Sequence, residues 1–277
     1  MSQVWLVTGS SRGLGRAIVE AGLLAGNRVL ATARHIGSLR ELSERYGEQV
    51  KLFALDVTDE SSAAAAVRAA IDAFSSLDVV INNAGYGNLS SVEDTPMSDF
   101  RAQIETNLFG TIIVTKAALP YFRERKTGHF IQFSSVGGRI GPPGRGPYSA
   151  AKWGVEGFSE VLSREVAPLG IKVTIIEPGG FRTDFAGSST KLSEGRPEYE
   201  STVGATARFQ RDYNGKQPGD AKKAAQAIVQ LTQERNPPLR LLLGSDAYAA
   251  AEKNDLARLE EARIWRKLSV STDFETK

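Results

Sequence analysis

The sequence of 277 residues contains no cysteine and only two histidines, His35 and His129. The absence of cysteine excludes disulfide bonds, thiolate nucleophiles and cysteine-based metal sites. Because the two histidines are far apart in the sequence, structural zinc is not expected and a histidine-containing triad has few candidates. We expect no metal site, and any acid–base chemistry must come from other side chains.

The sequence also lacks long apolar runs and a strong charge of either sign. No apolar stretch approaches the roughly 20 residues of a membrane-spanning helix. The N-terminal residues lack the basic flank and long apolar segment of a secretory signal. The 34 Lys and Arg residues nearly balance 32 Asp and Glu residues, whereas a nucleic-acid-binding protein needs a concentrated basic face. We therefore expect a cytoplasmic protein that binds neither a membrane nor nucleic acid.

Short apolar runs alternate with stretches of helical character along most of the chain. The expected strands are 4–8, 28–33, 50–56, 77–83, 129–135, 171–178 and 239–243, and the expected helices are 13–26, 37–46, 59–75, 97–125, 147–168 and 220–235. Nearly continuous apolar strands separated by helices are typical of a parallel sheet that is covered on both faces. The pattern predicts an α/β fold, with a doubly wound parallel sheet of about seven strands in a single domain spanning 1–277.

Two segments depart from this alternation. Residues 184–219 are polar, contain glycine and exceed the usual length of a connection, which predicts a substrate lid or a disordered insertion. Residues 246–268 have the pattern of a further amphipathic helix, so that 246–277 would form a C-terminal helix and tail. No linker rich in proline, glycine or serine divides the chain into two domains.

A glycine-rich turn, "TGSSRGLG", joins the first expected strand to the first expected helix. Its glycines are Gly9, Gly13 and Gly15, in the spacing G-x-x-x-G-x-G rather than the more familiar G-x-G-x-x-G. Small residues let the backbone approach a pyrophosphate, and the helix N-terminus supplies amide donors and a positive dipole end. The turn therefore predicts a dinucleotide-binding site.

A second motif, "GPYSAAKWG", places Tyr148 four residues before Lys152. Residues at this spacing lie on one face of a helix. A cation beside a phenol favours the phenolate and lowers the pKa of the phenol. The pair is therefore a candidate general acid or base that needs no histidine.

Five motifs together resemble the short-chain dehydrogenase/reductase family. They are "TGSSRGLG", "NNAG" at Asn82–Gly85, Ser134 and Ser135 at a strand end, Tyr148 with Lys152, and "PGG" at Pro178–Gly180. They follow the family's order over residues 3–183, and Ser135 precedes Tyr148 by the family's usual thirteen residues. The resemblance implies a Rossmann fold and an oxidoreductase that interconverts a ketone or aldehyde with an alcohol.

The resemblance implies catalytic roles for four side chains. Tyr148 would be the general acid or base, and Lys152 would lower its pKa and bind the nicotinamide ribose. Ser135 would hydrogen-bond the substrate oxygen, and Asn107 would hold a water molecule that joins Lys152 to a proton relay. Two structural alternatives remain open, because Ser135 could cap a strand end and Asn107 could begin the following helix.

The resemblance also implies contacts for the cofactor and the substrate. The cofactor contacts are Gly9, Ser11, Arg12, Gly13, Leu14, Gly15, Arg34, Asp56, Val57, Asn83, Ala84, Gly85, Tyr148, Lys152, Pro178, Gly179, Phe181 and Thr183. The substrate contacts are Tyr86, Val136, Gly137 and Phe185. Thr183 would hydrogen-bond the nicotinamide carboxamide, whereas Asp56 would either contact the adenine or cap the helix that starts near Asp59.

The end of the second strand predicts which nicotinamide cofactor binds. An NAD-dependent enzyme usually places Asp or Glu there to accept from the ribose 2′-hydroxyl, but this chain has Ala33 followed by Arg34. Arg12 is a second base inside the glycine-rich turn, and two arginines can form charge-assisted hydrogen bonds with a 2′-phosphate. We predict NADP(H), although Arg34 could instead stack on the adenine of either cofactor.

The substrate is less clearly encoded. Residues 134–160 look like the family subset that includes 17β-hydroxysteroid and retinol dehydrogenases, which indicates a small-molecule carbonyl or alcohol of apolar character. One alternative is a 3-oxoacyl-carrier-protein reductase, for which a basic patch would be supplied by Arg139, Arg145, Arg182 and Arg208. Another is a non-catalytic dinucleotide-binding sensor, against which the intact set of four catalytic-type residues argues. A homo-oligomer remains open.

Overall fold

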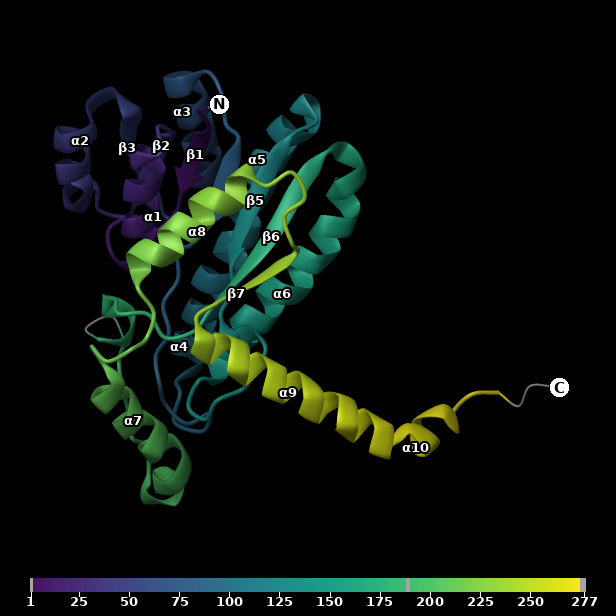
Figure 1. Cartoon of the computed structure of the whole chain (residues 1–277). Helices are drawn as coiled ribbons and strands as arrows, with labels where there is room; N and C mark the ends of the chain where they lie inside the picture. The colour runs from purple at the N-terminus through teal and green to yellow at the C-terminus, as the bar shows by residue number, and fades with distance from the viewer. Residues whose placement is uncertain (1, 188–189, 275–277) are drawn as a thin grey trace.

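Seven parallel strands form one sheet in the computed structural model, which describes residues 2–187 and 190–274. The strands are β1 (Val4–Val7), β2 (Arg28–Ala33), β3 (Val50–Ala54), β4 (Val79–Asn82), β5 (Gly128–Phe133), β6 (Ile171–Pro178) and β7 (Arg240–Leu243). Their order across the sheet is β3-β2-β1-β4-β5-β6-β7 (Figure 1). The predicted doubly wound parallel sheet of a Rossmann fold is confirmed.

Helices cover both faces of the sheet because successive strand residues point to opposite sides. Helices α1 (Gly13–Leu24), α2 (Arg40–Tyr46) and α8 (Ala221–Gln233) share one apolar cluster, to which β1 contributes Trp5 and Val7. Helices α3 (Glu60–Phe74), α5 (Gly110–Arg125) and α6 (Gly146–Val166) share the other, to which β1 contributes Leu6. Two layers of helix thus enclose a sheet that is apolar on both sides.

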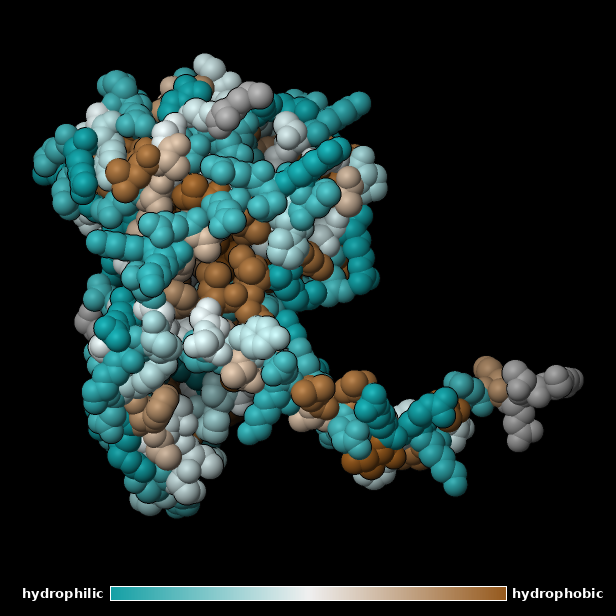
Figure 2. Space-filling model, viewed as in Figure 1, coloured by the Kyte–Doolittle hydropathy of each residue, from teal (hydrophilic) through white to brown (hydrophobic). Residues whose placement is uncertain are grey.

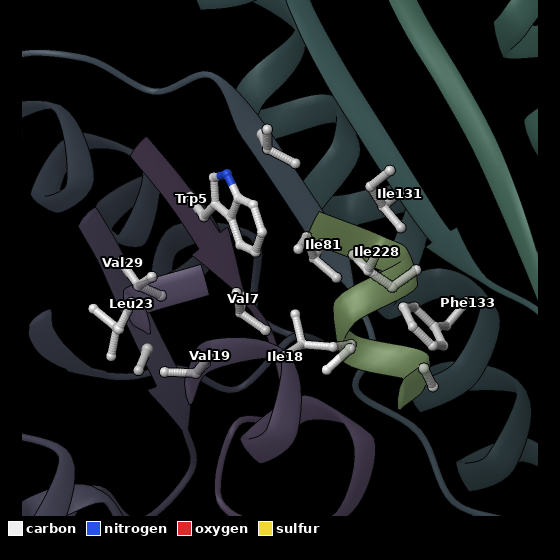
Figure 3. Packing of buried hydrophobic residues seen from close by; sticks show 14 of the residues in the cluster. Trp5, Val7, Ile18, Val19, Leu23, Val29, Ile81, Ile131, Phe133 and Ile228 are labelled. Carbon is white, nitrogen blue, oxygen red and sulfur yellow. The ribbon is translucent and has the colours of Figure 1, made fainter. Parts of the chain in front are cut away.

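Trp5 determines how closely α1 approaches the sheet. The indole is fully buried, and Figure 3 shows it beside Ile81 and Ile228. A Cβ atom at Gly22 of α1 would lie 2.7 Å from Cζ3 of Trp5, so only glycine fits between the helix and the ring. This packing positions α1, whose N-terminus follows the glycine-rich turn.

The helix expected over 97–125 forms without a break but changes its geometry part-way along. Helix α4 (Met97–Ile104) runs into a π-helical turn at Glu105–Phe109, and α5 then continues from Gly110. Asn107 lies in this turn, and its Nδ2 donates to the carbonyl of Gln103 at 2.8 Å. A π-turn inserts one residue into the helical repeat and often marks a functional site. The helical stretch expected over 97–125 is therefore confirmed, and the π-turn within it is a feature that the sequence did not indicate.

The segment predicted as a lid has more structure than its sequence indicated. It contains α7 (Ala205–Tyr213), and Val203 and Ala207 form a small apolar cluster with Leu89. Arg196 pairs with both Glu93 and Asp94, at 2.8 Å and 2.7 Å. Residues 188–189 of this segment lie outside the described part of the chain. The segment is thus attached to the loop after β4, and its motion remains a prediction.

The C-terminal helix extends away from the rest of the molecule. Helix α9 (Ser245–Ile264) is buried only in its first turns, and the short α10 (Arg266–Val270) follows it (Figure 1). We define the C-terminal arm as residues 252–274. Its exposed apolar side chains are visible in Figure 2 and include Leu256, Leu259, Ile264, Trp265 and Leu268. Within the described residues, no helix is both long and apolar enough to cross a membrane.

Candidate active site

A cleft of about 850 Å³ lies at the carboxyl ends of the strands. The chain leaves β1 toward β3 on one side and returns to β4 on the other, and dinucleotides bind at such switch points. Every residue predicted to contact the cofactor lines this cleft: Gly9, Ser11, Arg12, Gly13, Leu14, Gly15, Arg34, Asp56, Val57, Asn83, Ala84, Gly85, Tyr148, Lys152, Pro178, Gly179, Phe181 and Thr183. The fold thus gathers residues from five separate turns and from helix α6, although their contacts with a cofactor stay predictions.

The glycine-rich turn needs glycine for two different reasons. Gly9 and Gly13 have φ angles of 68° and 58°, in the left-handed region where a side chain is strained. At Gly15, a Cβ atom would lie 2.3 Å from the Gly9 carbonyl oxygen and 2.4 Å from Nδ2 of Asn83. The turn is therefore narrow, and it leads into the N-terminus of α1, whose first residues line the cleft.

The two asparagines of "NNAG" have different roles. Asn83 Nδ2 donates to the carbonyls of Thr8 and Gly9, at 3.0 Å and 3.2 Å, and thereby fixes the glycine-rich turn. Asn82 points into the protein, where its Nδ2 donates to Gln132 at 2.8 Å and to Thr115 at 3.0 Å. The motif therefore holds β1, β4 and β5 in register and also presents its last residues to the cleft.

The glycine-rich turn and the end of β2 each provide an arginine, and the end of β2 has no acid. Arg12 and Arg34 are both exposed and line the cleft, and neither forms an ion pair among the described residues. Asp56 also lines it and accepts hydrogen bonds from the backbone and side chain of Thr58. Asp59, not Asp56, caps α3, by accepting from the amides of the first turn. The capping alternative for Asp56 was thus wrong.

Tyr148 and Lys152 lie on α6 as predicted, and both are buried. Lys152 Nζ donates to the carbonyl of Phe133 at 2.7 Å and lies 5.8 Å from the centre of the Tyr148 ring. Burial lowers the pKa of Lys152 to about 8, although the charge of Glu156 acts in the opposite direction. The lysine therefore changes its charge close to the physiological pH range.

The acidity of Tyr148 differs from the expectation that Lys152 would lower it. Burial raises the pKa of Tyr148 above its usual value, because the phenolate would lose its hydration. A hydrogen bond with Ser135 and the charge of Arg145 act in the opposite direction. In the protein without cofactor, Tyr148 is therefore a protonated phenol, which suits a proton donor.

Asn107 and Ser135 differ in how they reach the cleft. Asn107 is fully buried behind the loop after β4, where it accepts from Tyr86 N at 3.0 Å and donates to Tyr86 O at 2.8 Å. A Cβ atom at Gly85 would lie 2.4 Å from its Oδ1 and 3.5 Å from Lys152 Nζ. Ser135 lines the cleft while accepting from Gly137 N at 3.0 Å. Both side chains thus have structural partners beside their predicted roles.

The substrate side of the cleft is only partly as expected. Tyr86 and Phe185 line the main cleft, whereas Val136 and Gly137 line an adjoining hollow of about 150 Å³. Four further lining residues were not singled out from the sequence, although the last three belong to the predicted lid: Arg145, Phe209, Gln210 and Tyr213. The last three come from α7, whose formation within the polar 184–219 segment had no clear signal. Arg145 was considered only for a basic patch near the cleft that would contact an acidic carrier protein, although it lies three residues before Tyr148.

The turn after β6 connects the cleft to the lid and to α9. Gly180 N donates to Oδ2 of Asp246 at 2.7 Å, and a hydrogen bond joins Asp246 to the Tyr213 hydroxyl. Thr183 accepts from Phe185 N at 3.3 Å at the edge of the cleft. The loop predicted to cover the nicotinamide is therefore fixed by Asp246 of α9 at Gly180 and by its own hydrogen bond at Thr183.

The donor set matches a dinucleotide better than a metal ion. A narrow glycine turn leads into the N-terminus of α1, and Arg12 and Arg34, which form no ion pair among the described residues, line the cleft. Among the residues that the structure describes, no group of three or more His, Asp or Glu side chains is placed to hold a metal ion. The residues present thus fit a nicotinamide dinucleotide.

Comparison with known proteins agrees with this geometry. A family model described as short chain dehydrogenase matches residues 3–193. The chain belongs to the short-chain dehydrogenase family. Oxidoreductase BOA17 from Botryotinia fuckeliana is 48% identical over 275 residues, covering 98% of this chain and 100% of its own length. This short-chain dehydrogenase is thus an oxidoreductase by family.

Two solved structures share the fold over nearly all of the chain. A short-chain dehydrogenase from Streptomyces avermitilis has a TM-score of 0.92 and 40% identity, covering 99% of this chain and 100% of its own. ElxO, solved with NADP bound, has a TM-score of 0.76 and 25% identity, covering 90% and 100%. This short-chain dehydrogenase therefore has a structural neighbour that was solved with NADP bound.

The buried lysine gives a prediction for stability against pH. The pKa of Lys152 is lowered to about 8 in the folded state, from 10.5. Between these values the unfolded chain binds the proton that the folded chain has lost, so Lys152 makes stability rise with pH. The stability of Lys152→Met relative to the wild type should therefore fall from pH 7.5 to pH 10.5. Urea unfolding of both proteins measures this, and a difference independent of pH would contradict the shifted pKa.

Proposed function

We propose that this chain is an NADP(H)-dependent carbonyl reductase or alcohol dehydrogenase, in which Tyr148 is the general acid and base. The observation that carries the proposal is a buried phenol that lines the dinucleotide cleft beside Ser135 and Lys152. A phenol that stays protonated can donate to a carbonyl oxygen as negative charge develops there. The reaction interconverts a ketone or aldehyde with an alcohol.

Each polar side chain has a definite task in this proposal. Bound NADPH would supply the hydride that adds to the carbonyl carbon, leaving NADP⁺. Tyr148 donates its proton to the carbonyl oxygen, and Ser135 hydrogen-bonds the same oxygen. Lys152 stabilises the resulting phenolate through its charge and binds the nicotinamide ribose. Asn107, on the far side of Gly85 from the cleft, positions the water through which Tyr148 regains a proton.

The preference for NADP(H) over NAD(H) is part of the same proposal. Support comes from Arg12 and Arg34, which have no acidic partner among the described residues, and from Ala33, where an acid would repel a phosphate. Charge-assisted hydrogen bonds from two arginines suit the dianionic 2′-phosphate. The same arginines give no comparable gain with a 2′-hydroxyl.

The two alternatives receive less support. Of the four arginines considered for an acidic carrier protein, Arg139 pairs with Glu177 at 2.9 Å and Arg208 pairs with Glu200. Ion pairing leaves less positive charge for an acidic partner. A non-catalytic sensor would have no use for a buried phenol and ammonium side by side, which are costly to bury.

The proposed function is tested by NADPH oxidation with a panel of aldehydes and ketones, followed at 340 nm. Turnover of at least one carbonyl compound, with NADPH preferred over NADH at equal concentration, is the expected result. Tight binding of NADPH with no turnover across aliphatic, aromatic and acidic carbonyls would instead favour the sensor.

We propose that residues 184–219 close over the substrate, with α7 as the moving element. The contacts of residues 184–219 with the rest of the chain include exposed ion pairs such as Arg196 with Glu93. Exposed ion pairs contribute little to stability. Amide exchange in 205–213 should therefore slow at least tenfold when NADP⁺ and a substrate analogue are bound, because closure shields the helix. Equal exchange in the free and bound protein would show a fixed element.

We also propose that the chain forms a homo-oligomer through its C-terminal arm. Leu256, Leu259 and Ile264 are exposed there, and a projecting helix with such side chains is typical of an interface. Light scattering should show at least a dimer for the full chain and a smaller species for a chain that ends at Asp255. A monomeric full chain at micromolar concentration would contradict this.

A further inference from the structure

The substrate side of the cleft contains a cation that has no counter-ion. Arg145 lines both the main cleft and the adjoining hollow beside Tyr148. Its Nη1 donates to the Gly87 carbonyl at 3.0 Å, and its Nη2 donates to Gln210 Oε1. Within the described ranges it forms no ion pair, and the two carboxylates that line the cleft, Asp56 and Asp184, form none with it. A part-buried guanidinium without an acid is costly to keep.

A second donor lies next to this cation. Gln210 of α7 is 8% exposed, and its Nε2 has no hydrogen-bond partner in the structure. Buried amide groups in folded proteins are nearly always paired. Because Oε1 of the same carboxamide already accepts from Arg145, an acceptor placed against Arg145 would also come close to Nε2. Nε2 is closed off from solvent in this structure, so a shift of the Gln210 side chain would present it to the same anionic oxygen that Arg145 lacks.

Gly87 shows how close this pair of donors is to the reacting group. A Cβ atom at Gly87 would lie 2.7 Å from Cδ2 of Tyr148 and 3.3 Å from Nη1 of Arg145. The Tyr148 ring and the Arg145 guanidinium thus both lie close to the backbone of Gly87. A ligand that touches the Tyr148 hydroxyl with one group can reach Arg145 with another group a few bonds away.

We propose that the substrate is a carboxylate, namely an oxo acid and the corresponding hydroxy acid, bound through Arg145 and Gln210. The inference deepens the proposed function and rests on it. The carboxylate accepts from free N–H groups of Arg145 and from Gln210 Nε2, while the carbonyl oxygen faces Tyr148. The rest of the molecule lies along Phe185 and Phe209, which makes an apolar chain the natural continuation. The sequence predicted an apolar carbonyl compound or alcohol, and the proposal adds a negative charge to that substrate.

Arg145 could instead have a purely structural role, because its hydrogen bonds to Gly87 and Gln210 join the loop after β4 to α7. In that case an esterified ligand would bind as well as an acid, and removing the charge would weaken both equally. The ratio of acid to ester therefore separates recognition from a general loss of structure.

The first experiment measures binding without turnover. Octanoate and methyl octanoate are titrated into the enzyme saturated with NADP⁺, by calorimetry. Octanoate should bind at least tenfold more tightly than the ester, since a hydrogen bond to a charged group has about that effect. Arg145→Met should remove the difference, whereas Arg68→Met, on the exposed outer side of α3, should keep it. If Arg145→Met fails to fold, Gln210→Met is measured in its place. This variant retains Arg145 and should reduce the difference in affinity between octanoate and methyl octanoate.

The second experiment measures turnover with 2-oxo, 3-oxo and 4-oxooctanoate and their methyl esters. At least one acid should exceed its own ester tenfold or more in kcat/KM, and in Arg145→Met this ratio should approach one, mainly through KM for the acid. Esters equal to acids, or a ratio that survives Arg145→Met, would overturn the carboxylate site. Octanoate binding through Arg145 with no carbonyl reduced would support the site and overturn the proposed reductase.

Discussion

Replacement of Tyr148 by phenylalanine should lower kcat for carbonyl reduction by about 10² to 10⁴-fold, the usual contribution of a general acid. The change removes only the hydroxyl that donates the proton and leaves the ring, which is packed 5.7 Å from the ring of Phe185. Because the ring of Tyr148 and all the other predicted cofactor contacts are kept, the Kd for NADPH should change by less than about threefold. Stopped-flow turnover and a fluorescence titration measure the two quantities.

Tyr46→Phe is a matched control for this change. Its hydroxyl is also buried, but it lies on α2, away from the residues that line the cleft. The control should retain kcat within about twofold. Activity of Tyr148→Phe within threefold of the wild type would remove Tyr148 from the role of general acid.

The double variant Ala33→Asp/Arg34→Leu should exchange the cofactor preference from NADP(H) to NAD(H). The aspartate would accept from a 2′-hydroxyl and repel a 2′-phosphate, and the leucine removes one of the two charges expected to hold that phosphate. Each charge-assisted hydrogen bond is worth about 1.5–3 kcal/mol. We therefore expect kcat/KM for NADPH to fall by about 10² to 10³-fold, with a smaller gain for NADH.

Steady-state kinetics with both cofactors at a saturating carbonyl substrate measure this exchange. Arg68→Leu, which removes an exposed arginine from α3, is the control and should leave the NADPH to NADH ratio unchanged. If the wild-type enzyme already works better with NADH, the interpretation of the β2 terminus is wrong.

Local patterns predicted the elements that depend on local chemistry. The glycine turn, the Tyr148 and Lys152 pair and the absence of an acid at Ala33 are readable because each needs particular residues at fixed spacing. The apolar runs predicted seven parallel strands, because a short continuous run of apolar residues indicates a buried strand without knowledge of the neighbouring strands. The order of the motifs then placed them at one edge of the sheet.

Features that depend on contacts between distant segments were not predictable in this way. The π-turn places Asn107 where it hydrogen-bonds Tyr86, which lies 21 positions earlier. The raised pKa of Tyr148 depends on how fully the fold buries it. Arg145 and Gln210 are 65 positions apart, and their contact appears only when α7 packs over the cleft. Polar residues in 184–219 gave no sign of this, because their partners lie elsewhere in the chain.

The most direct test of the central claim follows the hydrogen that is transferred. NADPH carrying deuterium at C4 is incubated with the enzyme and a carbonyl compound that it consumes, and the alcohol is analysed by mass spectrometry and proton NMR. Our account predicts one deuterium on the carbinol carbon, transferred from one face of the nicotinamide, with the hydroxyl hydrogen derived from water through Tyr148. NADPH that binds in the cleft but transfers no deuterium to the carbonyl carbon of any compound would contradict it.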